Sequence, residues 1–198
     1  PGQRYVAKPS IITCIALRLR TMIRIRPCTL QDMPAITAIY AYFVLESTAT
    51  FEAEVPTEQD MALRRQDVLA KGLPYLVITQ AKGGAQEVMG FAYANWFKPR
   101  AAYRFSAENS IYLHHDAAGK GLGKLLLAEL LTQLERLGIR KVMAVIGGSE
   151  NLASIGLHKA LGFTMAGLIE GAGWKQGRWL DLVLMQRTLG VGSSRPAL

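Results

Sequence analysis

The sequence predicts a single α/β domain in which a mixed β-sheet of about seven strands is flanked by about four helices. Two observations support this fold class. Strand-like apolar segments alternate with segments at helical spacing, in the order β-α-α-β-β-β-α-β-α-β-β. The chain of 198 residues, 50% of them hydrophobic, is also long enough to bury one core.

The first three elements lie before the middle of the chain. Residues 23–26 alternate isoleucine with arginine, which predicts a strand that Pro27 ends. Apolar residues at helical spacing from Met33 to Phe43 predict a first helix. A second helix is expected over about residues 57–71, closing at Gly72.

Three strands follow. The apolar segments Tyr75 to Thr79 and Val88 to Trp96 are separated by the turn signal Gly83-Gly84, so they predict a hairpin. A further strand is expected from Ser110 to Leu113. It leads into a glycine-bearing stretch, residues 119–123.

The last third of the chain contains five more elements. Leucines at helical spacing over residues 125–137 predict a long amphipathic helix. A buried strand rich in valine and isoleucine is expected from Lys141 to Ile146, and a short helix from Ala153 to Leu161. The segments Phe163 to Ile169 and Arg178 to Gln186 predict a terminal pair of strands.

Charge and cysteine content narrow the function classes. The net charge is +8, but residues 1–21, interpreted as an N-terminal extension, supply four of these charges. The domain, residues 22–189, and the tail, residues 190–198, hold only scattered basic groups, so we expect no nucleic-acid binding. Apolar runs are too short to span a membrane. Two cysteines, Cys14 and Cys28, without metal-ligand spacing indicate a cytoplasmic protein.

The glycine-bearing stretch is the most informative motif. Gly119, Gly121 and Gly123 allow backbone N–H groups to converge at a helix N-terminus, an arrangement that binds pyrophosphate. Lys120 and Lys124 add positive charge nearby. The spacing fits neither a Walker loop nor a dinucleotide fingerprint. Taken alone, such a stretch is more often a tight turn that leads into a helix than a phosphate site.

Two motifs in order resemble those of the GNAT N-acetyltransferase superfamily. The stretch Ala118-Gly119-Lys120-Gly121-Leu122-Gly123 occupies the place of the family's Q/R-x-x-G-x-G/A motif. Asn151 is followed seven residues later by His158 and then by Leu161-Gly162-Phe163. This resemblance implies a GNAT-like fold whose sheet splays apart between strands 4 and 5.

A closer resemblance, covering nearly all of residues 23–189, is to the phosphinothricin and methionine sulfoximine acetyltransferase branch. It rests on residues 96–103, 107–113, 144–146, 154–158 and 177–181. The branch implies acetyl-CoA as co-substrate and a small amino-acid analogue as acceptor. It also implies a homodimer.

The reaction needs a general base, because a protonated α-amine must lose a proton before it attacks the thioester. The resemblance places that base at Glu108, at the head of the strand before the glycine loop. It places at His158 a group that protonates or hydrogen-bonds the leaving thiolate. Both residues have a non-catalytic alternative. Glu108 could be an ordinary carboxylate exposed to solvent at the end of a strand, and His158 could be a core histidine whose hydrogen bonds are made within the protein.

The resemblance also implies the residues that hold acetyl-CoA. These are Ile111, Tyr112 and Leu113 on the strand, Gly119, Lys120, Gly121, Leu122, Gly123 and Lys124 in the loop and helix start, and Asn151. The strand would also supply the N–H donor for the oxyanion. Asn151 could instead cap the helix that follows it. The family's Gln or Arg is Ala118 here, and the loop before Asn151 is one residue longer than usual.

Acceptor contacts are implied around a short basic segment. They are Lys98, Pro99, Arg100, Tyr103, Glu108, Asn109 and Ser110. A lysine and an arginine could hold a carboxylate or phosphinate, although a solvated basic turn is the alternative. Trp96, Trp174 and Trp179 are expected to pack in the core or in a dimer interface. His114-His115 lack further ligands, so we expect no metal.

We therefore predict an acetyl-CoA-dependent N-acetyltransferase acting on the α-amine of phosphinothricin, methionine sulfoximine or a related compound. One rival keeps the fold and acetylates another amine or a protein N-terminus. Another rival is a CoA-binding module without turnover, against which Glu108 and His158 argue.

Overall fold

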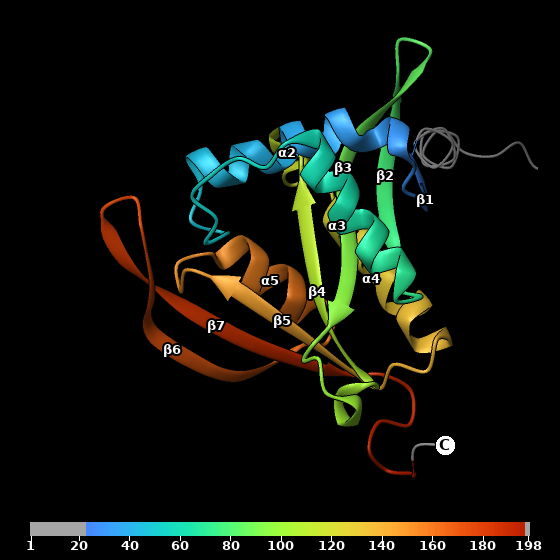
Figure 1. The fold of residues 1–198 in the computed structure, drawn as a ribbon, viewed down its shortest axis with the longest axis vertical. Helices are drawn as coiled ribbons and strands as arrows, with labels where there is room; N and C mark the ends of the chain where they lie inside the picture. The colour runs from blue at the N-terminus through green and yellow to red at the C-terminus, as the bar shows by residue number, and fades with distance from the viewer. Residues whose placement is uncertain (1–22, 197–198) are drawn as a thin grey trace, which may run out of the picture.

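Seven strands form one mixed sheet in the computed structural model, which describes residues 23–196 (Figure 1). The strands are β1 (Ile23–Pro27), β2 (Tyr75–Lys82), β3 (Ala85–Trp96), β4 (Ser106–Leu113), β5 (Lys141–Gly147), β6 (Thr164–Lys175) and β7 (Arg178–Thr188). Their spatial order is β1-β2-β3-β4-β5-β7-β6. Only β4 and β5 pair in parallel. The predicted fold class is confirmed, whereas the extension over residues 1–21 lies outside the described residues.

Four helices cover the two faces of the sheet: α2 (Met33–Glu46), α3 (Glu58–Ala70), α4 (Leu122–Arg136) and α5 (Leu152–Ala160). On one face, the ring of Tyr40 in α2 packs edge-on against Tyr112 of β4. On the other face, the space beside Gly123 of α4 is filled by Leu113 of β4 and Leu157 of α5. Because neighbouring side chains of a strand point to opposite faces, α2 and α3 cover one face and α4 and α5 the other.

Several element boundaries differ from the sequence prediction. Helix α4 begins at Leu122 rather than at residue 125, because Gly121 takes the N-cap position and Leu122 is itself buried. Strand β4 begins at Ser106 rather than Ser110, since Ala107 and Asn109 alternate inward although their residue types rarely favour strands. Strand β6 continues to Lys175, well beyond the expected end at Ile169.

The expected splay lies between the two parallel strands. Their register runs from Ser106 opposite Lys141 to Asn109 opposite Ala144 and ends there. Beyond this point β4 continues to Leu113, and β5 pairs with β7 as far as Gly147. The second halves of β4 and β5 therefore diverge and leave a V-shaped opening at the centre of the sheet.

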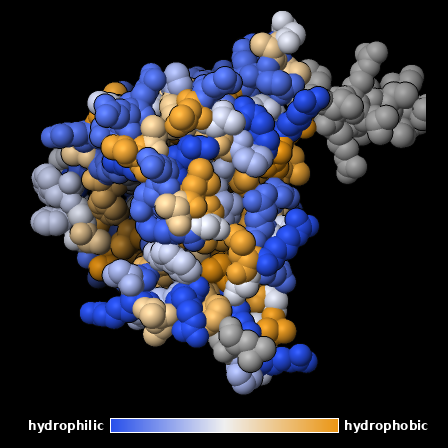
Figure 2. Space-filling model, turned by 45° about the vertical axis from the view of Figure 1, so that its right-hand side comes forward, coloured by the Kyte–Doolittle hydropathy of each residue, from blue (hydrophilic) through white to orange (hydrophobic). Residues whose placement is uncertain are grey.

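The surface is mixed in character. Figure 2 shows hydrophilic residues interspersed with apolar ones over one face of the molecule. Trp174 and Trp179 are 61% and 66% exposed, so the core position considered for them is wrong. Trp96 is partly buried and packs against the core. Across residues 23–196, no helix combines the length and the apolar character needed to cross a bilayer.

Candidate active site

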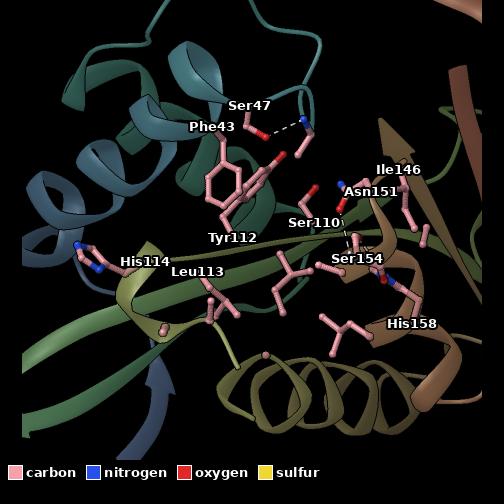
Figure 3. A pocket seen from close by; sticks show the side chains of 18 of the residues that line it. Phe43, Ser47, Ser110, Tyr112, Leu113, His114, Ile146, Asn151, Ser154 and His158 are labelled. Carbon is pink, nitrogen blue, oxygen red and sulfur yellow. Dashed lines mark hydrogen bonds between the residues drawn. The ribbon is translucent and has the colours of Figure 1, made fainter. Parts of the chain in front are cut away.

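A cavity of about 560 Å³ occupies the opening between β4 and β5. Four parts of the chain meet around it, as Figure 3 shows: the end of α2, the second half of β4 with the glycine loop, the end of β5, and the start of α5. Its lining includes Phe43, Ser47, Ala49, Asn109, Ser110, Ile111, Tyr112, Leu113, Gly119, Gly121, Gly123, Lys124, Ile146, Asn151, Ser154 and His158. Most of the residues predicted to hold acetyl-CoA are thus brought together.

The glycine loop presents the N-terminus of α4 to this cavity. Gly119 and Gly121 have φ values of 70° and 75°, a conformation that residues with side chains rarely adopt. Gly121 is the N-cap and offers no side chain to the first N–H groups of the helix. Those groups have no intrahelical acceptors, and the helix dipole makes this end positive. With the Lys124 ammonium beside it, the loop fits a pyrophosphate.

Two predicted loop residues contribute differently. The side chain of Leu122 is buried in the core, so only its backbone N–H faces the helix end. Lys120 is exposed and lines a neighbouring hollow beside the β2–β3 hairpin. His114, His115 and Asp116 also border that hollow, and their ligand-type atoms lie within 4.8 Å of one another. The absence of a metal stays a prediction.

Glu108 lies inside β4, one residue before the strands diverge. Its side chain shares the α2 face of the strand with Ser110 and Tyr112, because these residues alternate along β4. Burial raises the pKa of Glu108 above its ordinary value, while the nearby Lys98 ammonium opposes that shift. A carboxylate with a raised pKa is a stronger base than one in water.

His158 lies on the opposite face of β4 and is 2% exposed. Its Nδ1–H donates to the Ser154 carbonyl oxygen at 2.8 Å, and its Nε2 accepts from Asn109 Nδ2 at 3.0 Å. Burial lowers the pKa of His158. The ring is therefore neutral, with its proton on Nδ1, and it would have to gain a proton at Nε2 before donating one to the cavity.

Asn109, the hydrogen-bond partner of His158, has a side-chain oxygen without a hydrogen-bond partner of its own among the described residues. Its side chain is 5% exposed and lines the cavity. The Oδ1 atom has no hydrogen-bond partner among the described residues. A buried acceptor without a partner costs about 1–3 kcal/mol, which an N–H group in the cavity would offset. The wall therefore suits an amide-bearing ligand such as pantetheine.

Asn151 caps α5, as one sequence interpretation expected. Its Oδ1 accepts from the Ser154 backbone N–H at 3.2 Å, and the residue also lines the cavity (Figure 3). Asp181 of β7 fixes the loop before it: Ser149 Oγ donates to Asp181 Oδ2, and the Gly148 N–H donates to the Asp181 carbonyl. These contacts hold the loop that leads into Asn151, which lines the opening.

The basic segment lies apart from the cavity, in the β3–β4 connection. Lys98, Pro99 and Arg100 are exposed, and Tyr103 packs edge-on against Phe97. None of these residues lines the opening between β4 and β5. The segment joins β4 at the end nearer to Glu108, which explains the effect of Lys98 on that carboxyl.

No motif in the sequence predicted one wall of the cavity. Phe43 and Ser47, at the end of α2, and Ala49, in the segment after it, line the opening across from Ser110 and Tyr112 (Figure 3). Phe43 follows the helical spacing of core residues, so its pattern resembles ordinary packing. Ser47 and Ala49 belong to no motif.

Comparison with known proteins agrees with this geometry. Residues 25–184 match the acetyltransferase (GNAT) domain family. The chain belongs to the GNAT acetyltransferase family. It is 46% identical to a phosphinothricin N-acetyltransferase from Alcaligenes faecalis over 164 residues, 83% of this chain and 81% of the relative.

Two further relatives are similar along most of their length. An L-methionine sulfoximine/L-methionine sulfone acetyltransferase from Pseudomonas aeruginosa is 41% identical over 176 residues, 87% of this chain and 98% of the relative. A crystal structure of a GNAT phosphinothricin acetyltransferase from Sinorhizobium meliloti in complex with AcCoA superposes with a TM-score of 0.84. It is 44% identical, and the match covers 89% of this GNAT chain and 94% of that one.

The hydrogen bonds of His158 predict a single tautomer. We expect ¹⁵N NMR of the imidazole to show Nδ1 protonated and Nε2 bare at pH 6.5, because burial and Asn109 favour the neutral ring. The folded-state pKa is lowered, so a charged ring should appear only below pH 6.5, with loss of stability as the pH falls. Two protonated ring nitrogens at pH 6.5 would contradict this assignment.

Proposed function

We propose that this GNAT enzyme transfers the acetyl group of acetyl-CoA to the α-amine of phosphinothricin, methionine sulfoximine or a related amino-acid analogue. One observation supports this above the others. The splayed strands and the bare N-terminus of α4 meet around one opening, and the half-buried Glu108 lies on β4 one residue before the strands diverge, outside the lining of that opening. The relatives at 46% and 41% identity carry those substrates in their names.

In this proposal acetyl-CoA is held by backbone groups more than by side chains. The N–H groups at Gly119 and Gly121 through Lys124 bind the pyrophosphate, aided by the Lys124 ammonium. The edge of β4 at Ile111 to Leu113, left without a β5 partner by the splay, pairs with the amides of the pantetheine arm. Asn151 Nδ2, now 3.4 Å from the Gly147 carbonyl, is a further donor for that arm.

Glu108 is the proposed general base. It takes a proton from the acceptor ammonium, directly or through a water, and the freed amine attacks the thioester carbonyl carbon. A β4 backbone N–H stabilises the oxyanion, after which the C–S bond breaks and the new C–N amide bond remains. The nitrogen loses its second proton as the amide forms, and the departing thiolate gains one. We assign the delivery of that proton to His158, whose Nε2 must first be protonated, so that one proton lost by the nitrogen balances the one gained by the sulfur.

Anionic acceptors fit the charge beside the base. Lys98 and Arg100 are exposed cations in the connection that enters β4, and Pro99 and Tyr103 belong to the same segment. We propose that this segment holds the acceptor carboxylate or phosphinate, with Asn109 and Ser110 completing the contacts. A cationic polyamine would be repelled there. The alternatives, another amine, a protein N-terminus or a CoA-binding module without turnover, have no specific feature in their favour.

We also propose a homodimer that acts in the cytoplasm on small molecules, without nucleic acid or membrane. The apolar β6–β7 surface supports the dimer. The Trp174 and Trp179 rings, 61% and 66% exposed, pack edge-on against each other at 5.4 Å, and Leu168 and Ile169, each 48% exposed, lie farther along β6 on opposite sides of the strand. Exposed clusters of large apolar side chains mark interaction surfaces. The cytoplasmic location rests on the cysteine content alone.

A panel of acceptors tests the substrate class. We expect thiol release from acetyl-CoA with phosphinothricin, methionine sulfoximine and methionine sulfone, and none with spermidine or an N-terminal peptide, since the acceptor segment is cationic. Reactions without acceptor measure background hydrolysis. Turnover with only the peptide or only the polyamine would agree with an acetyltransferase and would refute the proposed class of acceptor. Tight CoA binding without any turnover would favour the non-catalytic alternative.

Substitution of the base tests the mechanism. Glu108→Gln should lower kcat by about 10²–10⁴-fold and leave CoA affinity unchanged, because a positioned base contributes this much. In the wild-type enzyme, kcat/KM should fall as the pH drops through the raised pKa of Glu108, above 4.5, and the variant should lose this dependence. Glu58→Gln, at the exposed start of α3, is the matched control. Unchanged turnover in Glu108→Gln would exclude Glu108 as the base.

The oligomeric state tests the apolar surface. Light scattering should give about twice the monomer mass for the wild-type chain, and a monomer for Trp179→Ser, because that change removes a large exposed apolar side chain. Leu30→Ser, at an exposed leucine 64% accessible on another surface, should remain dimeric. A monomeric wild-type chain would refute the dimer.

A further inference from the structure

The tip of the β6–β7 hairpin carries a buried lysine that the proposed chemistry does not use. Lys175, the last residue of β6, is 7% exposed. Its Nζ donates to the carbonyl oxygens of Phe43 at 3.3 Å, Ser47 at 2.7 Å and Thr50 at 2.8 Å. The neighbouring Gln176 Nε2 donates to the Leu45 carbonyl at 3.1 Å.

These four carbonyls belong to the end of α2 and the segment after it. The last carbonyls of a helix have no intrahelical donors, and they give that end a partial negative charge. The last turn of α2 contains no basic residue of its own. Lys175 and Gln176, more than 120 positions away in the sequence, provide the missing donors and positive charge.

A second contact fixes the same segment against the same hairpin. The ring of Phe51 lies so close to Gly173 of β6 that a Cβ at this position would be 2.4 Å from two ring atoms. Only glycine allows that approach. The residues from Phe43 to Phe51 are therefore held by the hairpin through three contact points: Gly173, Lys175 and Gln176.

This segment forms the wall of the cavity that faces Ser110 and Tyr112 of β4. Phe43 and Ser47 line the opening across from these two residues (Figure 3). Glu108 does not line the cavity, but it shares the β4 face of Ser110 and Tyr112, so an amine bound between β4 and this wall lies on the same side of the strand as Glu108. The carbonyls bound by Lys175 include those of both lining residues, Phe43 and Ser47.

We propose that Lys175 is a positioning residue for the acceptor site: it holds the Phe43–Phe51 wall in the conformation that binds the acceptor amine, without touching the acceptor. The inference rests on the proposed function and adds a residue to it. If the ordered wall were populated only a tenth of the time, the acceptor KM would rise about tenfold. The kcat would change little, because the wall is already in its ordered conformation in every enzyme molecule that has bound the acceptor.

Three variants separate this role from a general loss of structure. Lys175→Met removes the ammonium and keeps most of the stem. Gln176→Gly removes one donor, and glycine suits the positive φ of 49° at that position. Lys82→Met, at the exposed end of the β2–β3 hairpin, is the matched control, and between residues 23 and 196 its lysine pairs only with Glu87.

For each variant we would measure kcat and KM for phosphinothricin, the Kd of CoA by calorimetry, and amide hydrogen exchange of the intact protein. Lys175→Met should raise the acceptor KM about tenfold and leave kcat and the CoA Kd within about twofold of the wild type. Exchange should accelerate over residues 43–52 and stay unchanged in β4 and α4. Gln176→Gly should shift the same quantities less, and Lys82→Met not at all.

The outcomes that would overturn the proposal are distinct from failure of the proposed function. Unchanged KM and unchanged exchange over residues 43–52 would show that the wall does not depend on Lys175. A parallel loss of kcat and CoA affinity with faster exchange throughout would show a merely structural role. Hydrogen exchange and CoA affinity need no turnover, so both can be read even if the wild-type enzyme acetylates none of the amines tested.

Discussion

The end of the β4–β5 ladder at Asn109 and Ala144 is the constraint on which the site depends. Up to this pair the backbone N–H and C=O groups of the two strands hydrogen-bond to each other, and beyond it they do not. Backbone donors and acceptors at the centre of a sheet are costly to leave unpaired. The opening therefore suits a ligand that is itself a chain of amides, and the N-terminus of α4 lines the same cavity.

The pleat of β4 divides the chemistry between two sides. Glu108, Ser110 and Tyr112 face α2, whereas Asn109 faces His158 on α5. Glu108, the proposed base, and the imidazole of His158 are thus on opposite faces of the strand. This separation also keeps the two titratable groups in different surroundings: one carboxyl with a raised pKa and one imidazole with a lowered pKa.

Local pattern was enough to predict most of the fold. The period-2 segments, the leucine spacing of α4 and the glycine turn signals all describe neighbours along the chain, and the seven strands and four helices follow from them. Strand β4 was predicted too short because Ala107, Glu108 and Asn109 have no strand preference of their own, and their neighbours β3 and β5 impose the conformation.

Only those parts of the site that depend on local sequence patterns were predicted. The glycine loop and Asn151 act through local geometry, which residue type reveals. The wall formed by Phe43 and Ser47, and the contacts of Lys175, join segments more than 120 residues apart. Neither end of that contact has a distinctive pattern, so only the folded chain shows it. The exposure of Trp174 and Trp179 likewise depends on how far β6 and β7 extend beyond the sheet.

The β6–β7 hairpin has two faces with different partners. Lys175 points inward to the end of α2, and its neighbour Trp174 points the other way, onto the apolar surface. Association of another molecule with the Trp174 side of the hairpin would therefore stabilise the same backbone that holds the cavity wall. Thermodynamic linkage makes such coupling reciprocal: if association on the tryptophan face favours acceptor binding, then the acceptor favours association by the same factor.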